Sequence, residues 1–279
     1  MSTVSKEITP AFDDSGIRAR KEGRLRECYL RYESIILKVL GICTFLGLWE
    51  LSVIIGWAKP IMVSSPSRVA VAGVDYIASD SFLVDAATSG IEFFFGFGLA
   101  LVVGIALGFA MGWFRRVEYF LDPIVNFLYA SPRIALVPLL VLWFGIGIES
   151  KIAIIFLMAV FPVAMNTSLA VRSVDKDLID LARSFNASGW QLLRSVVVPS
   201  SIPLIVTGMR IGLGVALIGV VVGEFMAATA GIGHRIEQAA SSFETDKVFV
   251  GLIIIGTCGV IFTETLRQIE GRLAKWKTT

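Results

Sequence analysis

The sequence predicts an all-α polytopic membrane protein with six transmembrane helices, and its composition and hydrophobic pattern both support this fold class. Of its 279 residues, 55% are hydrophobic and 17% are charged, and the mean hydropathy is +0.76. A soluble domain rarely reaches such an average, because its surface needs more charge. Several windows also exceed the roughly 18 apolar residues needed to cross a hydrocarbon core about 30 Å thick. They are continuously apolar, whereas the strands of a membrane β-barrel would alternate over short segments.

The chain is expected to begin with a cytoplasmic arm, residues 1–34, which carries the basic run Arg18–Arg26. A cleavable signal peptide would have a short basic start and a small-residue cleavage site, so we expect this arm to be retained. We interpret it as partly disordered up to Gly16 and then as an amphipathic helix near the membrane surface. A solvated tail is the alternative.

A transmembrane domain, residues 35–266, follows the arm, and residues 267–279 form a cytoplasmic tail. The predicted spans are Ile35–Trp57, Gly90–Phe114, Tyr119–Phe144, Ile152–Val171, Ile202–Met226 and Val248–Thr265. Lys and Arg gather in the arm, the tail and the loops after the second and fourth spans. The remaining loops hold only Lys59, Arg68, Lys151, Arg235 and Lys247. Basic loops stay in the cytoplasm, so both termini and the loop of residues 173–200 are predicted to be cytoplasmic.

That loop contains a polar, amphipathic segment between two apolar spans. Asp175 is expected to cap a first short helix, in which Leu178, Leu181, Ala182 and Phe185 share one face. The residues from Asn186 to Gly189 indicate a turn, and Ser188 starts a second helix whose apolar stripe continues through Leu192, Leu193 and Val196. Pro199 and Pro203 are expected to stop this helix and to begin the next span. Such a stripe suits a hydrophobic groove on a partner protein, although a helix resting on lipid would have the same pattern.

Catalytic chemistry is not predicted for this chain. It contains no Gly-x-x-x-x-Gly-Lys-Ser/Thr phosphate loop and no plausible nucleophile with a base beside it. The single histidine, His234, has no cysteine or clustered carboxylate nearby in the sequence, so a structural role is favoured over metal binding.

Several charged residues fall within or near the spans, and four of them bear on function. Arg133 follows Ser131-Pro132 in the third span, and Arg210 lies about two turns into the fifth. One hypothesis places one or both in a central cavity that attracts an anionic solute; the other pairs them with carbonyl groups, with acids such as Asp122, or with headgroups. Glu92 and Glu224 are expected near the outer ends of their spans, in interfacial water.

Small residues recur every four positions in two spans. Gly96, Ala100, Gly104, Gly108 and Gly112 form one ridge, and Gly208, Gly212 and Ala216 form another. Small residues at this spacing let helix backbones approach closely in a membrane. Packing within one chain is favoured over a seam between two copies.

The cytoplasmic segment resembles the EAA loop of binding-protein-dependent ABC importer permeases. That pattern reads Glu-Ala-Ala, three residues, Gly, nine residues, Ile-x-Leu-Pro, and here Asp180-Leu181-Ala182, Asn186 and Val196–Pro199 stand at the same spacing. Asn replaces Gly in the turn, and Asn is the residue after Gly that best tolerates a left-handed backbone. The runs Ala135–Ile148 and Gly208–Phe225, together with Ser64–Arg68, are similar to the nitrate, sulfonate and taurine branch.

The resemblance implies a type I ABC importer permease fold with cytoplasmic coupling helices, in the bacterial inner membrane. It also implies a homodimer of permease subunits, two cytoplasmic ATPase subunits that carry ATP and magnesium, and an extracytoplasmic solute-binding protein, with no cofactor in this chain and no nucleic acid. Residues implied in ATPase coupling are Asp177, Asp180, Leu181, Ala182, Arg183, Phe185, Asn186, Gly189, Leu193 and Pro199. Of these, Leu181, Ala182, Phe185 and Leu193 are expected to be buried by the partner, and Asp180 and Arg183 to orient it. The solute is expected to be sulfonate-, taurine- or nitrate-like, or alternatively an aromatic carboxylate or vitamin precursor; a channel or scaffold with a non-ATPase partner is a further alternative.

Overall fold

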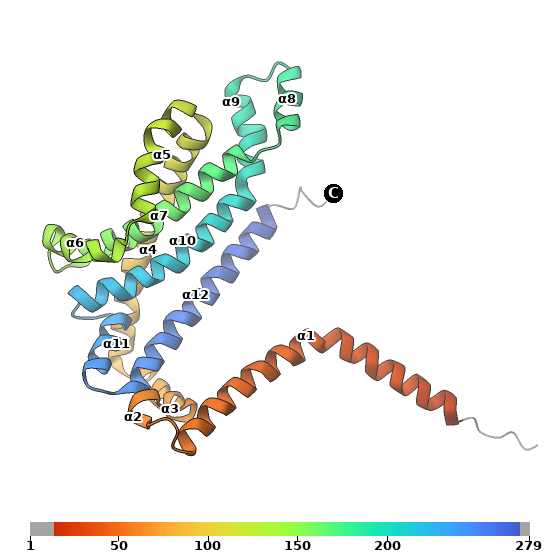
Figure 1. Ribbon diagram of the computed structural model, residues 1–279, viewed down its shortest axis with the longest axis vertical. Coiled ribbons are helices and arrows are strands. Elements are labelled where there is room, and N and C mark those ends of the chain that lie inside the picture. Colours follow the sequence, from red (N-terminus) through yellow and green to blue (C-terminus); the bar gives the residue numbers. More distant parts are fainter. Residues whose placement is uncertain (1–13, 274–279) are drawn as a thin grey trace, which may run out of the picture. The chain divides into compact units, whose positions relative to one another are not determined.

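A computed structural model of the chain describes residues 14–273, and every regular element in that range is a helix (Figure 1). The chain divides into two units, residues 1–59 and 60–279. In the first unit, α1 runs as one helix through the boundary between the expected arm and the first span, and its bounds are Asp14–Ile54. Residues 1–13 of the arm and 274–279 of the tail lie outside the described residues.

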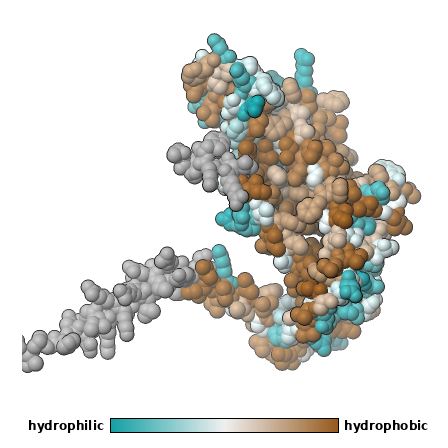
Figure 2. All heavy atoms as spheres, turned by 180° about the vertical axis from the view of Figure 1, so that it is seen from behind, coloured by the Kyte–Doolittle hydropathy of each residue, from teal (hydrophilic) through white to brown (hydrophobic). Residues whose placement is uncertain are grey.

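The second unit is a bundle of long helices with short helices at both of its ends (Figure 1). Its elements are α2 (Pro60–Val63), α3 (Pro66–Ile77), α4 (Asp80–Trp113), α5 (Arg115–Ala130), η1 (Arg133–Leu136), α6 (Val137–Phe144), α7 (Ile148–Arg172), α8 (Lys176–Ser184), α9 (Gly189–Leu192), η2 (Leu193–Val197), α10 (Val198–Ala227), α11 (Ile232–Ser241) and α12 (Thr245–Leu273). We call the end that carries α8 and α9 the coupling end, and the end that carries α3 and α11 the far end. Figure 2 shows hydrophobic residues over much of the middle of this unit, as expected for a surface that faces lipid.

Helix α7 forms the centre of the bundle, because α4 and α10 both pack along it. Ile155, Ala159 and Val163 on α7 are fully buried. The two predicted ridges of small residues make this contact. A Cβ added at Gly96 would lie 2.7 Å from Cβ of Ile155, so α4 approaches α7 more closely than any larger residue allows. The interpretation of the ridges as packing within one chain is confirmed.

Five described helical stretches are long and apolar enough to cross a membrane: Ile35–Ile54, Asp80–Trp113, Ile148–Arg172, Gly189–Ala227 and Thr245–Gly271. The predicted third span is not one straight helix, because Arg115–Ala130 and Arg133–Phe144 meet at an angle of 88°. Pro132 has no N–H to donate, and it holds Ser131 in an extended backbone with ψ 144°. This pair counts as a sixth span only if both of its halves belong to the same crossing.

The fifth span also differs from its prediction. Pro199 does not stop the helix that begins at Gly189; the helix continues through a π-helical turn, η2, into α10 and ends at Ala227. A wider turn just before Pro199 accommodates its missing N–H and its ring, which would clash with the preceding turn of a regular α-helix. Pro203 is likewise inside the helix.

Candidate functional site

The loop at the coupling end is built from two short, well-capped helices. The side chain of Asp175 accepts a hydrogen bond from the backbone N–H of Asp177 at 2.9 Å, as predicted for the start of α8. Ser188 caps α9, and a reciprocal bond from its own N–H to the side chain of Gln191 completes a capping box. Asn186 between them has φ +56°, so the left-handed turn expected from the resemblance is present. Each of these bonds satisfies a backbone group that the helix itself leaves unpaired.

Several large apolar side chains on this helix pair are exposed. Phe185 is 80% exposed and Trp190 is 69% exposed, and Leu178 and Leu181 are also largely exposed. Asp177 is exposed, and Asp180 and Arg183 form an exposed ion pair at 3.6 Å. The loop thus presents an apolar surface with charges beside it. We call the apolar surface formed by Leu178, Leu181, Phe185 and Trp190 the docking surface.

The predicted apolar stripe divides between two directions. Ala182 and Leu193 do not belong to the docking surface, because they pack against the chain's own cluster of Val171, Val174, Leu192 and Val197. The helical wheel places Ala182 beside Leu181, but α8 lies with its Ile179–Ala182 side on the bundle. Both side chains are half-buried, so they help to hold the helix pair in position and keep part of their surface exposed.

A recess of about 400 Å³ adjoins the helix pair. Its lining includes Phe109 and Trp113 at the end of α4, Phe114 directly after it, and Gly189, Trp190 and Leu193 at the start of the helical stretch Gly189–Ala227. Gly189 at the edge of this recess has no neighbouring atom within 4 Å of where a Cβ would stand. The apolar character of the docking surface therefore continues into a hollow beside it.

The two arginines within the spans have different partners. Arg133 donates a hydrogen bond to the carbonyl of Met158 at 2.8 Å, and its guanidinium lies 5.4 Å from the centre of the Tyr129 ring. Arg210 pairs with Glu270 of α12 at 2.8 Å, so its acid is Glu270 rather than Asp122. Among the described residues, no carboxylate lies within 4.0 Å of Arg133, whose charge is therefore not neutralised by an acid.

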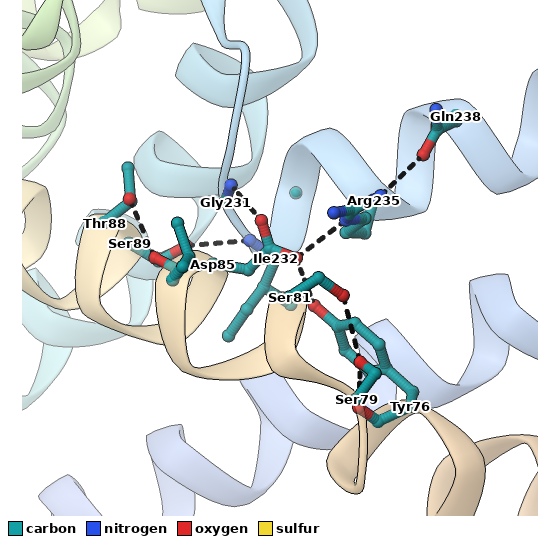
Figure 3. Close-up of polar contacts among 12 residues, drawn as sticks. Tyr76, Ser79, Ser81, Asp85, Thr88, Ser89, Gly231, Ile232, Arg235 and Gln238 are labelled. Atoms are coloured by element: carbon teal, nitrogen blue, oxygen red, sulfur yellow. Dashed lines mark hydrogen bonds and ion pairs between the residues drawn. The ribbon is translucent and has the colours of Figure 1, made fainter.

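A second polar cluster, which the sequence interpretation missed, lies at the far end (Figure 3). The carboxylate of Asp85 on α4 accepts hydrogen bonds from the backbone N–H of Gly231 at 2.9 Å, from Arg235 at 2.7 Å and from the hydroxyl of Tyr76 at 2.9 Å. Burial and the bond to Asp85 raise the pKa of the Tyr76 hydroxyl above its ordinary value. Asp85 thereby ties α3, α4 and α11 together.

Glu224, in the last turn of α10, completes this cluster. Its carboxylate accepts hydrogen bonds from the hydroxyl of Ser89 and from the backbone N–H of Gly233, both at 2.5 Å. The oxygen of Ser89 accepts in turn from the N–H of Ile232 at 2.9 Å. The first N–H groups of α11 are thus bound by side chains of α4 and α10. We call Asp85, Ser89, Glu224 and the backbone of Gly231–Gly233 the α11 clamp.

Glu92 and Glu224 are both 0% exposed, so the expectation that they lie in interfacial water was wrong. Glu92 pairs with Lys151 of α7 at 2.7 Å, and this lysine, expected in an outer loop, is itself buried. Asp85, Ser89 and Glu92 follow the spacing i, i+4, i+7 along one face of α4. A polar stripe with that spacing in an apolar span is the sequence signal that could have revealed the cluster.

A pocket of about 670 Å³ lies beside the α11 clamp, between α3, α11 and the start of α12. Arg235 and Gln238 of α11 line one side of it, and Arg68 and Asp75 of α3 line another. Acidic and basic residues both contribute to the lining. We call this hollow the far-end pocket.

Five long apolar helices among the described residues, with short helices at both ends of the bundle, are typical of a multi-pass membrane protein. Residues 100–275 match the family described as the binding-protein-dependent transport system inner membrane component, and the chain belongs to that family. It is a multi-pass membrane permease.

Two relatives illustrate the branch of the family. The putative aliphatic sulfonates transport permease SsuC of Bacillus subtilis (strain 168) is 31% identical over 264 residues, which cover 93% of this chain and 92% of the relative. The taurine transport system permease TauC of Escherichia coli (strain K12) is 40% identical over 177 residues, which cover 63% of this chain and 64% of the relative. The fold is also that of a chain of the inward-facing MetNI methionine ABC transporter, with a TM-score of 0.52 and 20% identity over 80% of this chain and all of that one.

Proposed function

We propose that the chain is the transmembrane subunit of an ATP-driven ABC importer, and that it contacts a separate ATPase subunit through the segment Asp175–Pro199. Two copies would form the translocation path, and an extracytoplasmic binding protein would deliver the solute. ATP and magnesium would be held by the ATPase. With the coupling end in the cytoplasm, both termini are cytoplasmic.

The observation that carries this proposal is the exposure of the docking surface. An exposed apolar side chain on its own is ordinary, but four large ones on two adjacent, well-capped helices mark an interaction site. Leu178, Leu181 and Phe185 have the i, i+3, i+7 spacing with which an amphipathic helix enters a groove. Asp180 and Arg183 at the edge are suited to orienting the partner, because charges at a rim affect register and association more than affinity.

The solute is proposed to be a small anion, and Arg133 is the residue proposed to attract it. A cation at membrane depth costs several kcal/mol unless water, an acid or a ligand compensates it. Arg210 has such an acid in Glu270, whereas Arg133 has one carbonyl and one aromatic ring. The aliphatic sulfonates and taurine named for the two relatives are compatible with an anionic or zwitterionic solute.

Phe185→Ala tests the docking role in the complex of permease, ATPase and binding protein reconstituted in vesicles. We expect lower stimulation of ATP hydrolysis by binding protein loaded with taurine or ethanesulfonate, because the most exposed side chain of the docking surface is removed. Phe95→Ala is the matched control, since Phe95 is also an exposed phenylalanine but lies in the middle of α4. Unchanged stimulation and unchanged assembly in Phe185→Ala would remove the docking role. Failure of any ATPase to co-purify with the native chain would favour a scaffold or channel with another partner.

Arg133→Gln and Arg133→Lys test the charge. Uptake of the anion should fall in the glutamine variant and be largely kept in the lysine variant, because the lysine retains the positive charge. Normal anion uptake by Arg133→Gln would discard Arg133 as a path residue. Uptake of a pyrimidine vitamin precursor in place of the sulfonates would redirect the solute assignment without affecting the docking role.

A further inference from the structure

One helical segment links the docking surface to the α11 clamp. It starts at Gly189, beside Trp190, continues through η2 and α10 without a break, and ends at Ala227. Figure 1 shows it running from the coupling end to the far end of the bundle. Glu224 lies in its last turn, so the acid that binds α11 belongs to the same element as part of the docking surface.

The carboxylate of Glu224 packs so tightly against the start of α11 that no side chain would fit at the two nearest glycines. A Cβ at Gly231 would stand 2.5 Å from the Glu224 carboxylate carbon, and one at Gly233 would stand 2.8 Å from a carboxylate oxygen. Gly231 also has φ +127°, a backbone region that residues with side chains rarely adopt. The two glycines thus let the backbone of α11 close directly around the carboxylate.

Packing alone does not account for an acid at this position. A buried carboxylate costs free energy unless it is hydrogen-bonded, and an apolar side chain at 224 would join α10 to α4 with less desolvation. What the carboxylate supplies is two acceptors, one for Ser89 and one for the N–H of Gly233. Its negative charge is also favourable beside the positive end of the α11 dipole. The acid is therefore suited to holding α11 in particular.

We propose that Glu224 is a positioning residue that couples α11 to the long helix, so that one wall of the far-end pocket moves with the docking surface when nucleotide binds. This inference rests on the proposed function, because it assumes that an ATPase moves the docking surface. Helix α11 carries Arg235 and Gln238 into the pocket wall. Motion of α10 therefore reaches the pocket through the α11 clamp.

The test measures how fast a membrane-impermeant maleimide labels Gln238→Cys in the assembled complex. The measurement compares the nucleotide-free state with a state trapped by MgATP and vanadate, in a background in which Cys28, Cys43 and Cys258 are replaced by alanine. With Glu224 intact, the labelling rate should differ between the two states. In Glu224→Gln the difference should be lost while ATP binding is kept, because an amide nitrogen takes the place of one acceptor oxygen.

Two further variants separate coupling from folding. Ser89→Ala removes one donor to Glu224 and one acceptor for α11, and it should reduce the labelling difference even if Glu224→Gln does not assemble. Thr88→Ala is the matched control, since the Thr88 hydroxyl is exposed and donates to the carbonyl of Val84 in its own helix. Gly96→Ala should lower stability through its clash with Ile155 but keep the labelling difference.

The outcomes distinguish this inference from the proposed function. A labelling difference that persists in both Glu224→Gln and Ser89→Ala would overturn the role of the clamp. So would the absence of any difference in the native complex when the ATPase is bound and active, because α11 would then be static. Failure of the native chain to bind an ATPase would instead overturn the proposed function.

Discussion

Lys151 on α7 and Glu92 on α4 form an ion pair at 2.7 Å, with both side chains almost completely removed from solvent. Such a pair is costly to bury, and removing one member leaves an uncompensated charge. Lys151 also lies against α10, since its Cβ and Cγ are 3.6 Å and 3.5 Å from where a Cβ on Gly223 would stand. The pair therefore belongs to the three-helix contact that forms the centre of the bundle.

Neutralising one member of this pair should destabilise the protein more than neutralising both. Glu92→Gln or Lys151→Met alone is expected to cost about 3–5 kcal/mol, because an unpaired charge remains at membrane depth. The double variant leaves no charge and should recover part of that loss. The apparent unfolding temperature in detergent, measured for all four members of the cycle, checks this expectation. Strictly additive effects would show that the two groups do not depend on each other.

Helix α4 should tolerate replacement of glycine by alanine away from the ridge of small residues but not on it. Gly108→Ala is expected to destabilise, because its Cβ would overlap the carbonyl of Ala164 and the side chain of Thr167. Gly98→Ala on the same helix meets nothing within 4 Å and should be neutral or stabilising by up to about 1 kcal/mol, the difference in helix propensity between the two residues. The expression yield and the apparent unfolding temperature in detergent, measured for both variants, check this expectation. Efficient disulfide cross-linking between two copies through Gly108→Cys would contradict the intrachain packing.

The features that could be predicted from the sequence are local ones. The caps at Asp175 and Ser188, the left-handed turn at Asn186 and the two glycine ridges each depend on residues a few positions apart, so spacing alone indicates them. The long apolar helices follow from composition for the same reason. Only the partner that each ridge meets, α7, had to come from the structure.

The features that were missed depend on residues far apart in the chain. The partners of Ser89 and Glu92 are Glu224 and Lys151, and nothing in their own neighbourhood identifies them. The bend in the third span was missed for another reason. Pro123, Pro162 and Pro203 all lie inside helices, so a proline in a span does not by itself predict a break. The packing of Ala182 against the bundle was also missed, because the sequence does not show which side of α8 lies against the bundle.

The turn at Asn186 should prefer residues that accept a positive φ. Asn186→Gly is expected to retain function and Asn186→Val to impair it, because a β-branched residue is a clear outlier at φ +56°. The impairment should appear as weaker ATPase stimulation, since the turn sets the position of Phe185 relative to α9. Ala187→Val controls for the added bulk at the neighbouring position. Equal stimulation in the valine and glycine variants would show that the turn does not determine the docking geometry.

Tyr76 should stabilise the far end at neutral pH but not in strong alkali. Its hydroxyl donates to Asp85 at 2.9 Å, and burial together with this bond raises its pKa above the ordinary value of about 10. Because the raised pKa favours the neutral hydroxyl in the folded state, its contribution is fully present below about pH 10. It is lost as the pH rises from there towards the folded pKa. Tyr76→Phe should therefore cost about 1 kcal/mol between pH 6 and 9, and this difference should shrink above about pH 10.

Apparent unfolding temperatures of the native chain and Tyr76→Phe, measured in detergent at pH 7, 9 and 11, check this pH dependence. Tyr129→Phe is the matched control, because it also removes a phenol hydroxyl but keeps the ring beneath Arg133. A difference between native and Tyr76→Phe that grew above pH 10 would mean that the ionised phenolate, rather than the neutral hydroxyl, is stabilised beside Asp85. That result would contradict the direction of the pKa shift, since a second negative charge next to the Asp85 carboxylate is unfavourable.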